Sequence, residues 1–240
     1  MKRIFEKIIF VAIFCCITLL FLRVAHAFRQ EKSEIIYAQQ VLLGSDLRIK
    51  KALFSPDDKV KQVLIGLIEA EQKAIFLAAY TLTDKDIAQA LLSAHQRGIA
   101  IEIIADGGKL WEQYSKIGLL CKEGIVVYSY TKKHKNMLEK DFYSSIMHNK
   151  FIIFAKTLNS PEPIVWTGSF NFTQSAAYKN QENVIVLQDA ELAQAYRNQF
   201  EVLKDRCICL NKKEVTWHHV EKEHETPFAW FLKRMKVINF

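Results

Sequence analysis

Apolar residues along the chain occur in short unbroken runs, which alternate with segments where apolar residues recur every three or four positions. The first pattern is typical of strands buried on both faces, and the second is typical of helices that cover a sheet. The runs predict strands at 75–80, 99–105, 125–128, 151–154, 164–167 and 183–187. Helices are predicted after Ser55, after a cap at Thr83 or Asp84, around Trp111 and from Ala190. This alternation predicts an α/β sandwich with a mixed, mostly parallel sheet.

The N-terminal segment has a different pattern. An apolar run from Ile8 to Leu22 follows basic residues and precedes Ala25-His26-Ala27, a small-x-small sequence typical of a signal-peptide cleavage site. The run is shorter than the roughly 20 residues of a full membrane span. We therefore favour a cleaved signal peptide at 1–27 over a membrane anchor at 4–22. The chain is expected to be exported, and to be periplasmic, secreted or held at the membrane.

Charge narrows the functional classes only slightly. The net charge is +7, and the first 27 residues hold Lys2, Arg3, Lys7 and Arg23 against Glu6, so the remainder carries +4. This mildly basic balance is compatible with an anionic polymer or a membrane surface as partner, and it is diagnostic of neither.

Three cysteines lie beyond the N-terminal apolar run: Cys121, Cys207 and Cys209. A disulfide from Cys121 to one of the other two and simple burial of Cys121 both remain open. Cys207 and Cys209 are too few and too closely spaced for a zinc site. No other group of side chains has metal-ligand spacing, so we expect neither a metal nor another cofactor.

Candidate chemistry gathers around the predicted strand at 151–154. His148 and Lys150 precede it, and because side chains alternate along a strand, they point to the same side. The segment Gly168-Ser169-Phe170-Asn171 follows the next strand, and Glu182 precedes the last one. A lone histidine before an apolar strand is more often structural. Here an ammonium, a carboxamide, a hydroxyl and a carboxylate accompany it, a set that suits attack on a phosphodiester.

This pattern resembles the phospholipase D superfamily, and particularly its small bacterial single-motif endonucleases, over about residues 50–204. The resemblance implies an α/β/α sandwich with one motif per chain. It also implies that His148 attacks phosphorus, that Lys150 and Asn171 bind phosphoryl oxygens, and that Glu182 accepts from the second imidazole nitrogen. The family's motif is His-x-Lys-x-x-x-x-Asp, and its Asp position is Ala155 here. In the family that Asp is a supporting residue, so its loss affects the level of activity and leaves the nucleophile in place.

The resemblance also implies a partner. Family members use two copies of the motif, so that one histidine attacks while the other protonates the leaving group, and this chain has one copy. A twofold homodimer would bring two His148 side chains together. Ser169 is expected to add hydrogen-bond donors for the substrate. The polar segment before His148 is either a solvated loop or a substrate grip, with three candidate binding residues: Lys132, Lys133 and Lys135.

Two substrate classes fit this machinery. Nucleic acid is preferred, with contacts to phosphates that tolerate any sequence. A phospholipid is second, with Phe142, Tyr143 and Met147 at the acyl boundary. A catalytically weakened binding domain is third. The chain then divides into a signal peptide or anchor (1–27), a linker or first helix (28–49), the catalytic domain (50–205) and a C-terminal tail of unknown role (206–240).

Overall fold

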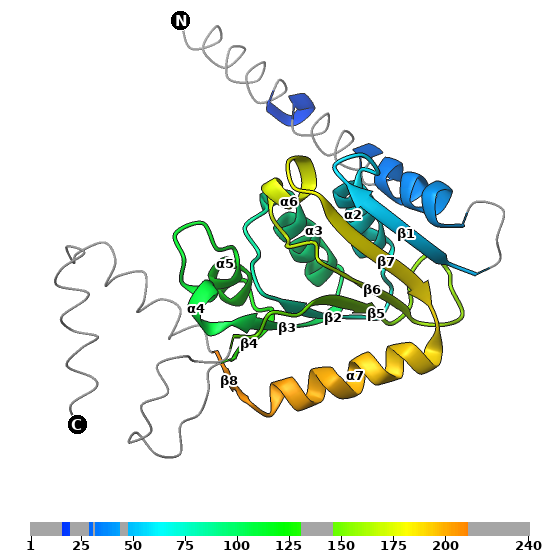
Figure 1. Ribbon diagram of the computed structural model, residues 1–240. Coiled ribbons are helices and arrows are strands. Elements are labelled where there is room, and N and C mark those ends of the chain that lie inside the picture. The colour runs from blue at the N-terminus through cyan, green and yellow to red at the C-terminus, as the bar shows by residue number, and fades with distance from the viewer. Residues whose placement is uncertain (1–15, 20–28, 31, 44–47, 131–145, 211–240) are drawn as a thin grey trace, which may run out of the picture.

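The computed structural model describes residues 16–19, 29–30, 32–43, 48–130 and 146–210. Within these ranges one sheet has eight strands in the order β1-β7-β6-β5-β2-β3-β4-β8 (Figure 1). The strands are β1 (Lys50–Ser55), β2 (Ala74–Ala79), β3 (Ala100–Asp106), β4 (Val126–Tyr130), β5 (Lys150–Phe154), β6 (Ile164–Gly168), β7 (Glu182–Gln188) and β8 (Cys207–Cys209). The helices are α2 (Val60–Ala70), α3 (Lys85–Gln96), α4 (Gly107–Leu110), α5 (Ile117–Lys122), α6 (Gln174–Tyr178) and α7 (Ala190–Lys204).

The predicted mixed sheet is confirmed, but the expectation that it is mostly parallel is wrong. Only β2–β3 and β3–β4 pair in parallel among the described strands, and the other neighbours are antiparallel. A parallel pair needs a crossover of roughly a dozen residues or more, usually a helix. The connection 155–163 between β5 and β6 is shorter than that and contains no helix, so these strands form an antiparallel pair.

The sheet separates two apolar cores, because residues along its central strands alternate between its faces. Ile75 and Leu77 of β2 pack into the larger core with α2, α3 and α5. Ala78 belongs to the smaller core, which is closed by Phe200 and other residues of α7. Figure 1 shows α7 crossing the face opposite to α2 and α3. This layering confirms the predicted α/β/α sandwich.

Several boundaries differ from the predictions. Strands β1 and β8 were not predicted, and the helix expected around Trp111 is two short helices, α4 and α5. Residues 32–43 are helical and pack closely on α2, since a Cβ at Gly66 would collide with the carbonyl oxygen of Glu34 and with Ala38. Cys121 and Cys207 are buried and Cys209 is exposed, and the Sγ of Cys121 donates to the carbonyl oxygen of Leu210.

Some sequence predictions fall outside the described residues. These include most of the N-terminal apolar run, the loop with Lys132, Lys133 and Lys135, and nearly all of the tail 206–240. Among the helices that the structure does describe, none is both long enough and apolar enough for a membrane span.

Candidate active site

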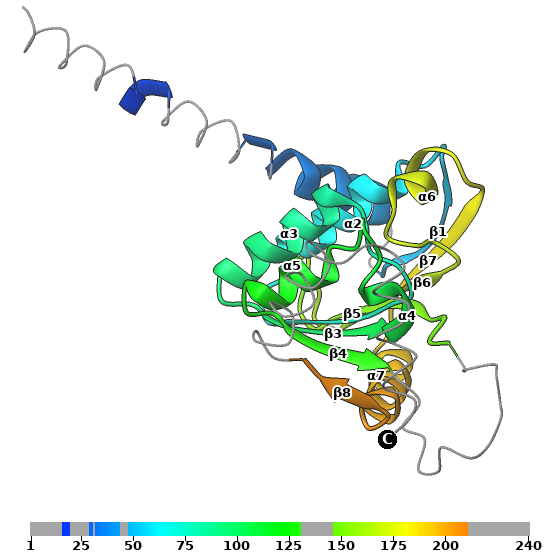
Figure 2. The ribbon, with the colours of Figure 1, turned by 90° about the vertical axis from the view of Figure 1, so that its left-hand side faces the viewer.

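The candidate site lies at one edge of the sheet, where β2 and β6 end and the antiparallel strands β5 and β7 begin. Ala79 at the end of β2 pairs with Lys150 at the start of β5. Gly168 at the end of β6 pairs with Val184 near the start of β7. Figure 2 looks at the molecule from the left-hand side of Figure 1 and brings α4 and α6, which border this edge, toward the viewer. Antiparallel pairing therefore brings the His148–Lys150 segment close to Ser169 and Glu182.

His148 and Lys150 share one aromatic neighbour, Tyr80. The His148 ring is exposed and meets the Tyr80 ring edge-on, with centroids 4.4 Å apart. Lys150 is only 7% exposed, and its Nζ lies 5.1 Å from the Tyr80 ring centroid. That Nζ donates a 2.8 Å hydrogen bond to the carbonyl oxygen of His148. Burial lowers the pKa of Lys150, and the negative charge of Glu182 opposes this shift only in part.

Tyr80 and Asp106 are two site residues that the sequence analysis did not select. Tyr80 follows β2, and its backbone N–H donates to the carbonyl oxygen of Asn149 at 3.2 Å. Asp106 ends β3, and its Oδ2 accepts a 2.9 Å bond from the N–H of Met147. A polar or aromatic residue directly after a buried strand is the sequence signal that could have found both, because ligands bind where strands end in such sheets.

Ser169 and Glu182 form a second cluster at the same edge. The Ser169 hydroxyl donates to Oε2 of Glu182 at 2.6 Å, and Nδ2 of Asn180 donates to Oε1 at 3.0 Å. The Ser169 Oγ also accepts from the N–H of Asn183 at 3.1 Å. A Cβ at Gly168 would collide with the Asn183 carbonyl oxygen, so this turn requires glycine. Both carboxylate oxygens of Glu182 are therefore bonded within its own loop.

The expected hydrogen bond between His148 and Glu182 does not occur within one chain. Both residues are described, and no hydrogen bond joins them; Glu182 instead bonds Ser169 and Asn180. The role of Glu182 toward an imidazole remains a prediction.

Asn171 lies in the loop between β6 and α6, and its carboxamide oxygen is buried without a partner among the described residues. The predicted role of Asn171, in which its amide N–H groups donate to phosphoryl oxygens, remains a prediction.

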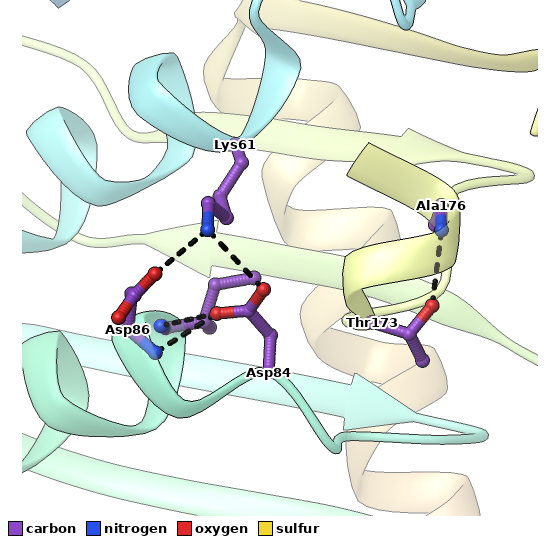
Figure 3. Close-up of polar contacts among 6 residues, drawn as sticks. Lys61, Asp84, Asp86, Thr173 and Ala176 are labelled. Atoms are coloured by element: carbon purple, nitrogen blue, oxygen red, sulfur yellow. Dashed lines mark hydrogen bonds and ion pairs between the residues drawn. The ribbon is translucent and has the colours of Figure 1, made fainter. Parts of the chain in front are cut away.

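The loop of Asn171 is fixed through its neighbour Phe172. The backbone N–H groups of Thr83 and Asp84 both donate to the Phe172 carbonyl oxygen, at 2.9 and 3.0 Å. The Phe172 N–H donates to the carbonyl oxygen of Thr81 at 3.1 Å. Thr173 then caps α6 by accepting from the N–H of Ala176, as Figure 3 shows.

Lys61 of α2 contacts two carboxylates at the start of α3. Its Nζ lies 3.4 Å from Oδ2 of Asp84 and 2.8 Å from Oδ2 of Asp86 (Figure 3), and 4.8 Å from the Tyr178 ring centroid. Burial alone would lower the pKa of Lys61, but the bond to Asp86 and the charge of Asp84 raise it overall. Of the two predicted cap candidates, Thr83 and Asp84, it is Asp84 that caps α3, by accepting from the N–H groups of Asp86 and Ile87. The buried ion pair of Lys61 and Asp84 thus joins α2 to the start of α3, and the Asp84 N–H links this junction to the Asn171 loop.

In the part of the chain that the structure describes, no three histidine, cysteine or carboxylate side chains gather as a metal site would require. The positive charge at the edge of the sheet comes instead from lysines. Lys150 is one, and Lys109 of α4 is another, with its Nζ 5.6 Å from the Tyr80 ring centroid. Lys109 also pairs with Glu112 at 2.6 Å, which raises its pKa.

Residues 64–204 match the family model described as cardiolipin synthase, PLD-like domain. The chain belongs to the phospholipase D superfamily. This family assignment confirms the resemblance inferred from His148, Lys150 and the Gly-Ser-x-Asn segment. The matched range includes all four predicted catalytic residues and ends with α7.

Curated relatives and solved structures agree with this membership. Phospholipase D of Rickettsia bellii is 35% identical over 143 residues, which is 60% of this chain and 63% of that protein. Mitochondrial cardiolipin hydrolase of Xenopus laevis is 31% identical over 147 residues, 61% of each chain. The chain thus spans less than two thirds of these relatives. Nuc of Salmonella typhimurium has the same fold, with a TM-score of 0.57 at 24% identity, covering 68% of this chain and 99% of that one.

Proposed function

We propose that this chain hydrolyses phosphodiester bonds through a phosphohistidine on His148, without a metal. An imidazole nitrogen attacks phosphorus, the bond from phosphorus to the leaving oxygen breaks, and that oxygen takes a proton. Water then attacks phosphorus, the P–N bond breaks, and free imidazole returns with a phosphomonoester. The observation that carries this proposal is the exposed ring of His148 beside the buried ammonium of Lys150, which supplies positive charge for the phosphoryl oxygens.

Purified protein tests this mechanism directly. We expect hydrolysis to continue in EDTA, because a lysine supplies the charge that a metal would otherwise provide. Brief reaction with labelled substrate, followed by alkaline quenching, should trap an acid-labile phosphoprotein. Activity that disappears in EDTA and returns only with a divalent ion would contradict the proposal.

The proton for the leaving group is proposed to come from a second His148 in a twofold homodimer. One chain carries one motif, and Glu182 bonds its own loop rather than its own His148. Mixing wild type with the His148→Ala chain under verified subunit exchange should lower activity toward the square of the wild-type fraction. A linear decline, or a fully active monomer, would show that another residue of the same chain supplies the proton.

Nucleic acid is the substrate class that we propose first, with sequence-tolerant endonuclease activity. Two lysines, Lys109 and Lys150, face the Tyr80 ring at the edge of the sheet, and such cations contact phosphates whatever the bases are. The exposed His148 is accessible to a polymer backbone.

A phospholipid is the second substrate class, and two observations favour it. The curated relatives at 31–35% identity are named for phospholipid phosphodiesters. In addition, Ile146 is 55% exposed two residues before His148, where it could enter an acyl boundary. Parallel assays on plasmid DNA, RNA, phosphatidylcholine and cardiolipin vesicles in EDTA distinguish the classes. Turnover of lipid alone would overturn the nuclease proposal and retain the mechanism.

Export of the chain is proposed on the sequence of its first 27 residues. Fractionation of the producing cell, with mass determination of the N-terminus, tests it. A cleaved product beginning near Phe28 supports a signal peptide, and an intact chain in the membrane fraction supports an anchor.

A further inference from the structure

Asp106 is a buried carboxylate whose two oxygens serve different elements. The residue is 5% exposed and is the last of β3. Its Oδ1 accepts from the N–H groups of Gly108 and Lys109 at 3.0 and 3.2 Å, which caps α4. Its Oδ2 accepts from the N–H of Met147 at 2.9 Å, 41 residues further along the chain. The second bond is not needed for capping, and it ends next to His148.

Backbone groups of Met147, His148 and Asn149 each form a hydrogen bond with a residue at a different strand end. The Met147 N–H bonds Asp106 of β3, and the Asn149 carbonyl oxygen accepts from the N–H of Tyr80 after β2. The His148 carbonyl oxygen accepts from Nζ of Lys150 on β5. The imidazole itself is exposed, and its described ring contact is with Tyr80. The orientation of the ring therefore depends on how firmly its backbone is held.

We propose that Asp106 is a positioning residue that sets the approach of the His148 imidazole to phosphorus. The inference rests on the proposed role of His148. A carboxylate suits this task because both of its oxygens accept, whereas an amide has one accepting oxygen and would turn an N–H donor toward one of the two elements. Displacing a reacting group by about 1 Å can cost roughly 10²-fold in rate. Asp106 touches neither substrate nor the reacting atoms in this proposal.

Strand β5 offers a matched control at its opposite end. Glu71 is 2% exposed, and its carboxylate accepts from the N–H groups of Lys73, Ala74 and Lys156. Glu71 bonds the backbone after Phe154, the far end of β5, and also the backbone at the start of β2. Asp106 of β3 likewise bonds the backbone before Lys150, the near end of β5. Glu71→Gln and Asp106→Asn therefore remove one buried negative charge each from the same kind of backbone clamp, at opposite ends of one strand.

The test compares full-length variants of Asp106 and Glu71 in kcat and KM. We expect Asp106→Asn to lower kcat by roughly 10- to 100-fold with KM within about threefold, because ground-state binding does not need the aligned imidazole. Asp106→Ser should do the same while keeping a cap for α4, since serine is a good capping residue but too short to reach Met147. Glu71→Gln should keep wild-type kcat. Amide exchange at Met147 should accelerate in the Asp106 variants only.

Two results would contradict the positioning role of Asp106. A folded Asp106→Ser variant with wild-type kcat would overturn the inference, and so would an equal loss of kcat in Glu71→Gln, which would indicate general loosening of β5. The His148→Ala variant, measured alongside, separates the two levels of proposal. If it is inactive while the Asp106 variants are fully active, this inference alone fails. If it retains turnover, the proposed function fails and the role of Asp106 fails with it.

Discussion

Buried carboxylates bond the backbone near both ends of β5, yet only one end carries the proposed catalytic residues. At the near end the Asp106 carboxylate accepts from the Met147 backbone, beside His148 and Lys150. At the far end the Glu71 carboxylate accepts from the N–H of Lys156, and the last residues of β5, Ile153 and Phe154, pack into the two apolar cores. A buried carboxylate bonded to backbone N–H groups is therefore no sign of catalysis by itself. What distinguishes the near end is an exposed imidazole and a buried ammonium held next to it.

The position of Ala155 shows which end of β5 the departure from the family's motif affects. Ala155 occupies the motif's Asp position and follows the last residue of β5, where its N–H bonds the Ala74 carbonyl oxygen. Lys150 is five residues earlier, which is about 17 Å along an extended strand. The missing carboxylate thus belongs to the far end of β5, and its loss removes no reacting group from the near end.

The largest effect is expected from removing the proposed nucleophile at the near end of β5. His148→Ala should lower kcat by at least about 10⁴-fold, because no other group would attack phosphorus, and it should abolish phosphoprotein labelling. The control His95→Ala, at the end of α3, should keep nearly full activity. Comparable activity or labelling in the His148→Ala chain would show that the near end of β5 is not the reactive one.

The charge on Lys150 gives the next largest effect. Burial lowers its pKa from the ordinary value of 10.5, so the ammonium loses its proton, and kcat should fall, at a lower pH than for an exposed lysine. Lys150→Arg should lower kcat by about 10- to 100-fold through altered geometry, but its guanidinium stays charged. The alkaline decline of kcat should then move to higher pH, because the guanidinium keeps its proton there. An unchanged alkaline limb in Lys150→Arg would assign that limb to another group.

At the far end of β5 the expected effect is on stability. Glu71→Ala leaves three backbone N–H groups without their carboxylate and should lower the free energy of unfolding by about 1–3 kcal/mol. The kcat of the folded protein should stay unchanged, as measured below the unfolding temperature. A large fall in kcat with stability preserved would mean that the far end also orients the site.

The smallest effect is expected from restoring the family's residue. Ala155 lines a pocket of about 320 Å³ together with Lys73 and Arg197, whose Nη1 has no hydrogen-bond partner among the described residues. Ala155→Asp should therefore stabilise the fold by about 1 kcal/mol or less, as partly exposed ion pairs do. Its kcat should stay within about twofold of wild type. An increase of tenfold or more would show that position 155 communicates with the near end.

Much of this architecture could be predicted from local patterns. The apolar run Phe151–Phe154 predicted a buried strand because continuous apolar runs need two covered faces, and the structure buries all of β5. A helix cap at Thr83 or Asp84 was recognisable from side-chain chemistry, and the structure has the cap at Asp84. Strand β1 was not, because its exposed lysines and mixed burial give no clear period, and it is a strand through its pairing with β7. The share of parallel pairs was missed in part because three antiparallel pairs, β1–β7, β2–β5 and β4–β8, join strands that are distant in sequence.

By itself the sequence determined the chemical identity of the site: the His148 and Lys150 spacing, the Gly-Ser-x-Asn turn and Glu182 are local features that reveal the family. Only the tertiary structure decided which groups hold them. Tyr80 contacts His148, and Asp106 bonds the neighbouring Met147, because β2 and β3 end at the edge where β5 begins. Glu182 bonds Ser169 because β6 pairs with β7. Such contacts join residues that are far apart along the chain, and hydrogen bonds form between atoms brought within about 3 Å by folding.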